Sequence, residues 1–236
     1  MERGSSGIVF VHGIVGNNKI FEFLRERVPE KWECRFVKLE GHGGDALSFS
    51  CASMKQWKKQ VAEAVGELAT SCDRILGVGH SMGCLLLINQ ATENRLSGLF
   101  LMNPPLRIRL RISLLSNAIK VAMGMTKHDP VAEAAKEAYG VSLDFNPLHY
   151  YGWPQRYFEL FREIGFVRSH LLGKVGCPVR ALLSSKDEMV SLASKAVLQK
   201  MPIVVTSILP DSTHYYYSTE DKPAICREFE ALIGML

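Results

Sequence analysis

Ser81 lies at the centre of the pentapeptide GHSMG, residues 79–83. The apolar run RILGVG precedes it, and apolar residues at helical spacing follow it from Met82. A serine hydroxyl is a weak nucleophile until a base takes its proton, and a tight strand-to-helix turn places it at the positive end of a helix. Flanking glycines suit such a turn because they leave room for the backbone and for a reactant. The pattern predicts a nucleophile, against the alternative of a serine that only caps the helix.

A nucleophilic serine needs a base, and the chain has seven histidines. His214 follows the last predicted strand, at the carboxyl end of the sheet, where the sites of open α/β folds collect. We therefore predict His214 as the base. His80 is expected to point away along its strand and to be structural. The remaining histidines lie in glycine turns or in the middle of the chain: His12, His42, His128, His149 and His170.

The base in turn needs a carboxylate that fixes its tautomer and stabilises the imidazolium. Asp187 directly follows a predicted strand in the sequence LLSSKDEMV. Glu188 is its neighbour, and Asp211 lies in the same loop as His214, so the sequence leaves both open as alternatives. We predict Asp187 because it follows the strand end.

Six short apolar and β-branched runs are predicted strands, and amphipathic stretches separate most of them. The runs are residues 7–11, 33–38, 74–79, 97–102, 178–184 and 203–209. The predicted helices beyond the one after Ser81 lie in residues 17–28, 53–72, 189–201 and 221–236. Alternation of this kind predicts an α/β fold with a mostly parallel sheet and helices on both faces.

About 70 residues between the fourth and fifth predicted strands carry no buried-strand pattern, which is too long for an ordinary loop. We predict a helical cap, or lid, over residues 104–176, and a core formed by residues 1–103 and 177–236. Helices are expected at 113–125, 130–139 and 154–172. The first of these and its surroundings are predicted to form an apolar ceiling over the site, through Leu114, Leu115, Val121, Met123 and Met125.

Together these motifs resemble the α/β-hydrolase superfamily, and within it the bacterial carboxylesterases and monoacylglycerol lipases. The segments VFVHGIVGNN, LEGHGGD, GVGHSMGC, SSKDEMV and STHYYY stand in that family's order and spacing. The resemblance implies Ser81 as nucleophile, Asp187 as acid and His214 as base. It also implies an oxyanion hole formed by the backbone N–H groups of Ile14 and Met82, although the HGIVG turn departs from the HGGG form of many relatives.

The resemblance and the apolar cap together predict a serine hydrolase that cleaves carboxylic esters through an acyl-enzyme, without metal or cofactor. The substrate is expected to be a small ester with an apolar acyl or alcohol group, such as a monoacylglycerol or a short- to medium-chain ester. A thioesterase, acyltransferase or aminopeptidase with the same triad stays open. An aminopeptidase would need carboxylates to hold an amine, and Glu133, Glu137, Glu159 and Glu163 are candidates. A silent ligand receptor on this scaffold is disfavoured because all three triad residues are present.

Charge, cysteine content and two further motifs bear on the expected partners and location of the protein. The formal net charge of +4 comes from scattered residues, which disfavours nucleic-acid binding. The six cysteines form no C-x-x-C pair, so reduced thiols and a cytoplasmic location are expected, without stable membrane insertion. The glycines of GHGG at 41–44 predict a tight turn and not a phosphate loop. In LRIRLRI, residues 106–112, alternate arginines are predicted to form a solvated face, with an anionic group or membrane surface as the alternative partner.

Overall fold

The computed structural model of the chain describes residues 5–93, 95–109 and 129–236. Six strands form one parallel sheet in the order β2-β1-β3-β4-β5-β6. The strands are β1 (Ser6–Val11), β2 (Glu33–Val37), β3 (Arg74–His80), β4 (Gly98–Met102), β5 (Val179–Ser184) and β6 (Val204–Leu209). The predicted number, position and parallel direction of the strands are therefore confirmed, with boundaries that differ by one or two residues.

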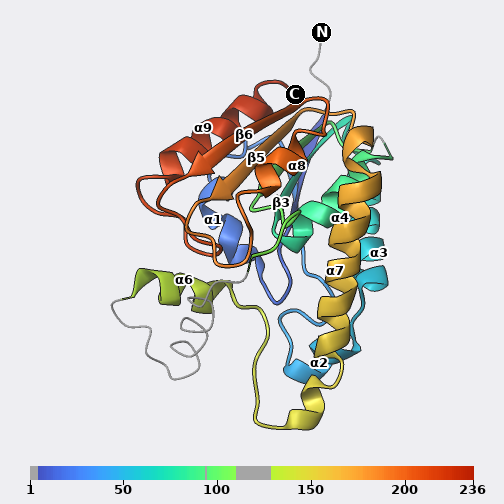
Figure 1. Cartoon of the computed structure of the whole chain (residues 1–236). Coiled ribbons are helices and arrows are strands. Elements are labelled where there is room, and N and C mark those ends of the chain that lie inside the picture. Colours follow the sequence, from blue (N-terminus) through green and yellow to red (C-terminus); the bar gives the residue numbers. More distant parts are fainter. Residues whose placement is uncertain (1–4, 94, 110–128) are drawn as a thin grey trace.

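Helices cover both faces of this sheet (Figure 1). The longer ones are α3 (Met54–Leu68), α4 (Met82–Ala91), α7 (Trp153–His170) and α9 (Lys222–Ile233), and the shorter ones are α1 (Glu22–Arg25), α2 (Ala46–Cys51), α6 (Pro130–Ala138) and α8 (Ser194–Leu198). Single 3₁₀ turns occur at η1 (Asn18–Phe21), η2 (Pro147–Tyr150) and η3 (Leu172–Lys174). The predicted α/β fold with helices on both faces is confirmed.

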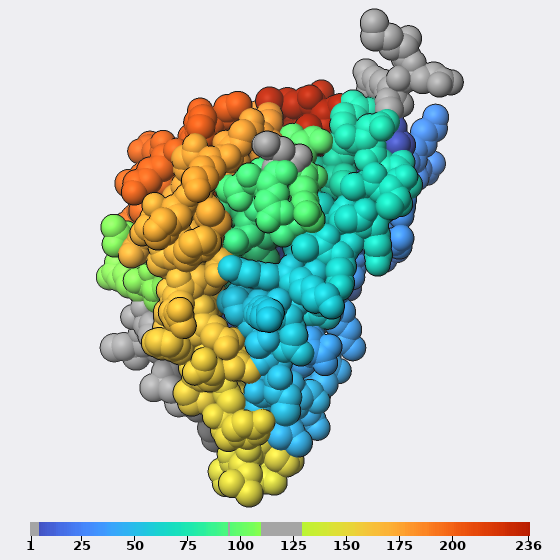
Figure 2. Space-filling model, turned by 90° about the vertical axis from the view of Figure 1, so that its right-hand side faces the viewer, coloured from blue at the N-terminus to red at the C-terminus, as the bar shows by residue number. Residues whose placement is uncertain are grey.

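Each central strand contributes to two cores because successive side chains point to opposite faces. Val9 and Val11 of β1 belong to a core cluster that also contains residues of α3, α4, α7 and α8, whereas Ile8 and Phe10 belong to a second cluster with residues of α1 and α9. Burial on both faces explains why these strands are continuous apolar runs rather than alternating ones. Figure 2 shows α7, in gold, beside the cyan α3 on the outer surface of the molecule.

The segment between β4 and β5 contains α6, η2 and α7, as predicted for the second and third helices of the cap. The expected helix at 113–125, with its five apolar ceiling residues, lies outside the described residues. Helix 189–201 was predicted too long: α8 spans only Ser194–Leu198, because residues 189–191 are extended and pair with residues 107–109. The short α2 has no counterpart among the predicted helices.

Smaller predictions have mixed outcomes. Gly41 and Gly43 both have φ of +77°, which confirms a tight turn in GHGG. All six cysteines are free, and only Cys72 and Cys84 among them are buried. In the described part of the chain, no helix has the length and apolar character needed to cross a membrane.

Candidate active site

The carboxyl ends of three strands bring the three predicted triad residues together. Ser81 follows β3, Asp187 lies three residues beyond β5, and His214 lies in the loop after β6. His214 Nε2 is 3.1 Å from Ser81 Oγ, and His214 Nδ1 is 2.7 Å from Asp187 Oδ2. The side chains of His214 and Asp187 are each 1% exposed, so this chain of hydrogen bonds is shielded from water.

Ser81 occupies a strained backbone conformation, with φ of +51° and ψ of −120°, at the junction of β3 and α4. The junction is closed tightly enough that a Cβ at Gly83 would lie 1.9 Å from the carbonyl oxygen of Val11, and one at Gly79 would lie 2.7 Å from the nitrogen of Cys84. These approaches explain why both positions of the pentapeptide are glycine. The turn directs the serine away from the sheet and toward His214.

Asp187 is held by more than the histidine. Its Oδ1 accepts the backbone N–H groups of Met189 and Val190, both at 2.7 Å. Burial alone would raise the pKa of this carboxyl. Attraction to His214 and the hydrogen bonds from His214, Val190 and Met189 outweigh burial, so the pKa lies below its ordinary value. Asp187 is therefore a carboxylate near neutral pH, which suits it to hold Nδ1–H of His214.

The two alternative acids have different partners. Glu188 is buried, and its Oε2 accepts the backbone N–H of His214 at 3.1 Å. Asp211 is exposed and pairs with Lys186 at 2.8 Å. The structure thus places Asp187, the predicted acid, in hydrogen-bond contact with the His214 ring.

Two side chains that the sequence left unused hold the carbonyl of His214. His80 Nε2 donates to it at 2.9 Å, and the two rings lie 4.9 Å apart, so the expectation that His80 points away is wrong. Asn103, just beyond β4, donates through Nδ2 to the carbonyls of Thr213 and His214, at 3.3 and 3.5 Å. Its Oδ1 accepts the N–H of Ser184 at the end of β5. Asn103 therefore joins the strand that leads to Asp187 to the loop that carries His214.

The turn that carries Ile14 lies directly against the serine. A Cβ at Gly13 would be 2.9 Å from Ser81 Cβ. Val15 has φ of +49°, and its N–H donates to His42 Nε2 at 3.0 Å. Met82 is the first residue of α4, a position whose N–H has no partner within the helix. These positions agree with the predicted use of the Ile14 and Met82 N–H groups, which stays a prediction.

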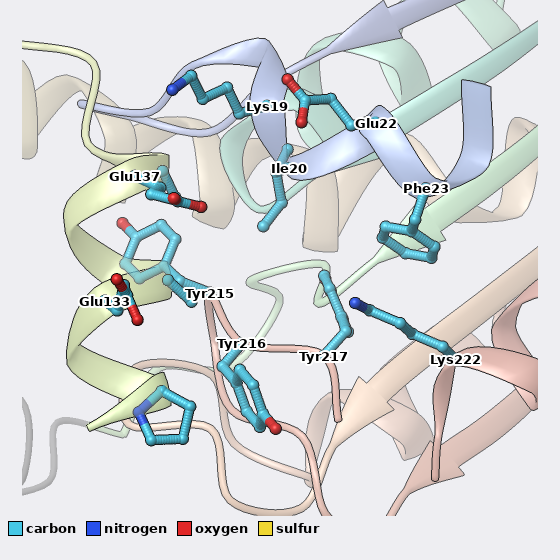
Figure 3. A pocket seen from close by; sticks show the side chains of 13 residues that line it. Lys19, Ile20, Glu22, Phe23, Glu133, Glu137, Tyr215, Tyr216, Tyr217 and Lys222 are labelled. Carbon is cyan, nitrogen blue, oxygen red and sulfur yellow. The ribbon is translucent and has the colours of Figure 1, made fainter. Parts of the chain in front are cut away.

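A pocket of about 390 Å³ lies beside the histidine loop, between η1, α6 and the tyrosines after His214 (Figure 3). Tyr215 lines it and packs edge-on against His214, with ring centroids 4.8 Å apart. In Figure 3, Glu133 and Glu137 extend from α6 on either side of the Tyr215 ring. Lys19, Glu22 and Lys222 line the same pocket. The described wall of this pocket therefore combines charged and aromatic side chains with apolar ones such as Ile20 and Ala138. The predicted apolar ceiling belongs to residues outside the described ones and stays a prediction.

The four glutamates of the predicted cap fall into two groups. Glu159 accepts the Met54 N–H and pairs with Arg156, and Glu163 pairs with Lys58. Glu133 and Glu137 instead face the pocket next to Tyr215. Within the described residues, no group of three or more His, Cys, Asp or Glu side chains is arranged to hold a metal ion.

The serine turn, the strand order and the three strand-end residues together match a known family. The family model described as "Alpha/beta hydrolase family" matches residues 8–228. The chain belongs to the alpha/beta hydrolase family. No curated protein sequence matches it.

Solved structures share this alpha/beta hydrolase fold at low identity. A structure reported for LipS and LipT, two metagenome-derived lipolytic enzymes, is 21% identical with a TM-score of 0.73, covering 99% of this chain and 95% of that one. The monoacylglycerol lipase of Paleococcus ferrophilus is 16% identical with a TM-score of 0.69, covering 98% and 95%. The monoglyceride lipase of Saccharomyces cerevisiae is 14% identical with the same TM-score, covering 98% and 87%. At these identities, the similarity establishes the fold.

Proposed function

We propose that this alpha/beta hydrolase is a serine hydrolase that cleaves carboxylic esters through an acyl-enzyme. The observation that carries the proposal is the buried hydrogen-bonded chain from Ser81 Oγ through His214 to Asp187. A serine becomes nucleophilic when a neighbouring base accepts its proton, and the base is effective when a carboxylate orients it. Lipolytic enzymes and monoacylglycerol lipases of the same fold support an ester substrate.

The proposed reaction uses the geometry directly. Ser81 Oγ attacks the ester carbonyl while His214 Nε2 takes the hydroxyl proton, and the N–H groups of Ile14 and Met82 stabilise the oxyanion. His214 then returns the proton to the leaving alcohol oxygen, which leaves an acyl-serine. Water attacks the acyl group in a second step with His214 again as base, and Ser81 is regenerated. Asp187 holds the Nδ1–H tautomer and stabilises the imidazolium in both steps.

The proposed substrate is a short- to medium-chain acyl ester or a monoacylglycerol-like ester. We further propose that residues 104–176 act as a cap over a core formed by residues 1–103 and 177–236. A panel of p-nitrophenyl esters from acetate to laurate would measure the chain-length preference through kcat/KM, because each methylene bound in an apolar pocket contributes roughly 1 kcal/mol or more. Acyl-CoA thioesters in the same panel distinguish a thioesterase, and an added alcohol acceptor distinguishes an acyltransferase.

The sharpest test of the nucleophile is covalent labelling. A fluorophosphonate probe should modify Ser81, located by mass spectrometry, and Ser81→Ala should abolish labelling and lower kcat by more than about 10⁴-fold. Ser184→Ala is the matched control: Ser184 is also a buried strand-end serine, and within the described residues its hydroxyl has no partner. The control should keep both labelling and activity. Labelling at another serine, or retained activity in Ser81→Ala, would contradict the proposal.

One observation supports a second candidate, an aminopeptidase. Glu133 and Glu137 face the pocket next to Tyr215, where a substrate amine could bind. Amino-acid p-nitroanilides test it: cleavage that Glu133→Gln and Glu137→Gln weaken through KM would favour the peptidase. Ester turnover without anilide cleavage would favour the esterase.

A further inference from the structure

A second hollow, of about 690 Å³, lies on the flank of the molecule between the last turn of α7, the region of α8 and the segment after β4. Figures 1 and 2 show α7 beside the orange segment that carries α8. Three of its lining residues are cations from three separate segments, Arg107, Arg168 and Lys200. The serines at 169 and 191 and four apolar residues complete the lining, which includes no carboxylate. We call this hollow the basic groove.

The arginine segment on one side of the basic groove is firmly held. Ile108 pairs with Val190 in an antiparallel bridge, and Ser191 N–H donates to the carbonyl of Arg107 at 2.8 Å. The Arg107 N–H donates to Ser194 Oγ at 2.9 Å. Over the described residues 107–109, the alternation predicted for LRIRLRI is confirmed: Ile108 packs against the core, whereas Arg107 and Arg109 are exposed. A fixed backbone reduces the entropy that Arg107 loses when it binds a ligand.

The three cations of the basic groove have no counter-charge in the described structure. Some other bases of the described structure do have one, such as Arg27 with Glu230 and Lys186 with Asp211. Arg107, Arg168 and Lys200 form no ion pair within the described residues. The undescribed segment 110–128 contains no aspartate or glutamate, so its sequence offers no carboxylate to pair with them. Gathering like charges without an anion costs free energy, and a bound anion removes that cost.

Another pocket that α7 helps to line contains cations together with carboxylates that balance their charge. Lys55, Lys58 and Arg162 line a hollow near α3 and α7, but Glu159 and Glu163 line it too. Lys58 Nζ is 2.6 Å from Glu163. The basic groove has the same number of cations and neither carboxylate. An anionic ligand would supply in the basic groove the charge that the glutamates supply in this pocket.

We propose that the basic groove is a binding site for the phosphate group of a ligand, separate from the Ser81 site. Two guanidinium forks can each donate paired hydrogen bonds to phosphate oxygens, and Lys200 adds a point charge. The Ser169 and Ser191 hydroxyls add uncharged donors. Three cations match a phosphate dianion better than a single carboxylate. The phosphate belongs either to a soluble phosphorylated molecule or to an anionic lipid headgroup.

The test compares two double variants of the whole protein that remove the same charge. The groove variant, Arg107→Gln with Lys200→Gln, removes two of the three cations of the basic groove. The control variant, Lys55→Gln with Arg162→Gln, removes an exposed lysine and an exposed arginine from the pocket near α3 and α7. Calorimetric titration with pyrophosphate and with ADP measures binding of soluble phosphate. Co-sedimentation with phosphatidylcholine vesicles, with and without phosphatidic acid, measures binding of a lipid headgroup.

We expect the wild type and the Lys55/Arg162 control to bind at least one phosphate probe, and the groove variant to bind it about a hundredfold more weakly. Binding confined to pyrophosphate and ADP identifies a soluble ligand, and binding confined to phosphatidic acid vesicles identifies a lipid headgroup. Ester kcat should be unchanged in both variants, which shows that they fold. Absence of binding to every phosphate probe overturns the proposal, as does equal loss in the two variants.

Discussion

Two pairs of buried histidines lie near the carboxyl ends of the central strands, and they differ in what their rings contact. The rings of His12 and His42 lie 4.8 Å apart, close to the 4.9 Å between His80 and His214. His12 and His42 exchange ring hydrogen bonds only with backbone groups, whereas His214 contacts a carboxylate and a serine hydroxyl. Comparing the two pairs therefore distinguishes what burial alone does to a histidine from what the proposed base His214 needs in addition.

Burial without a carboxylate keeps a histidine neutral. Burial lowers the pKa of His12 to about 4. It lowers the pKa of His42 to about 3, with a further contribution from the nearby His12. Such rings act as fixed donors and acceptors that brace turns, as His42 braces Val15 in the turn next to Ser81. A buried histidine can carry a proton through a reaction cycle only when a charge such as that of Asp187 is in contact with it.

The largest expected effect on kcat comes from removing the carboxylate that contacts His214, which leaves this ring without a charged partner, like those of His12 and His42. Asp187→Asn removes the carboxylate but keeps its size, and we expect kcat for ester hydrolysis to fall by a factor on the order of 10⁴, because the histidine tautomer is no longer fixed. Steady-state kinetics measure this. Asp211→Asn is the control, since Asp211 contacts Lys186 at the surface, and it should retain nearly full activity. Similar losses in the two variants would remove the distinction between the acids.

An intermediate effect is expected at Asn103, which supports the backbone of the histidine loop. Asn103 has φ of +51°, so Asn103→Gly keeps the conformation and removes only the side chain. We expect kcat to fall roughly five- to tenfold with little change in KM, because His214 loses part of its support while the binding surface stays. Asn103→Ala should in addition lower the free energy of unfolding, since alanine disfavours positive φ. An unchanged kcat in Asn103→Gly would limit Asn103 to a role in stability.

The smallest expected effect on activity is at His42, where the change appears in stability instead. An unfolded histidine titrates near pH 6.5, but the folded His42 stays neutral until about pH 3. The unfolded chain therefore binds more protons as pH falls below 6.5, and the free energy of unfolding falls by up to about 1.4 kcal/mol per pH unit for this one group. His42→Gln should make the dependence shallower by that amount while kcat changes little.

Urea unfolding of the wild type and His42→Gln at pH 7, 6 and 5 measures the difference in slope. Groups other than His42 contribute equally to both proteins, so the difference isolates this residue. Parallel dependences would mean that His42 titrates alike in the folded and unfolded chains. A large loss of kcat would mean that its hydrogen bond to Val15 is required for the chemistry.

The sheet and the three strand-end residues were predictable because their signals are local. A parallel strand buried on both faces is a continuous apolar run, and the residues just beyond such runs meet at one edge of the sheet. The sequence alone does not separate Asp187 from Glu188, because the directions of adjacent side chains in a loop depend on its three-dimensional path. In the structure, Asp187 faces the ring and Glu188 faces the backbone of His214.

The features that the sequence did not predict depend on contacts between segments that lie far apart in the chain. Asn103 acts on residues more than 100 positions away, and His80 contacts a carbonyl 134 positions away. No periodicity or short motif records such a pairing. The predicted helix 189–201 was too long for a related reason: its apolar spacing suits a helix, but residues 189–191 pair with the distant segment 107–109 instead.

The order in which the chain is made has a consequence for the candidate site. Ser81 and His214 are separated by 133 positions, with Asp187 between them. At a synthesis rate of about 5–20 residues per second, the serine emerges from the ribosome roughly 7 to 27 seconds before the histidine. The β3–α4 turn can form during that interval, but no base is present to activate it. A nascent or truncated chain that ends before residue 214 would therefore hold Ser81 without its proposed base, and under the proposed function it would show no ester turnover until synthesis had passed that point.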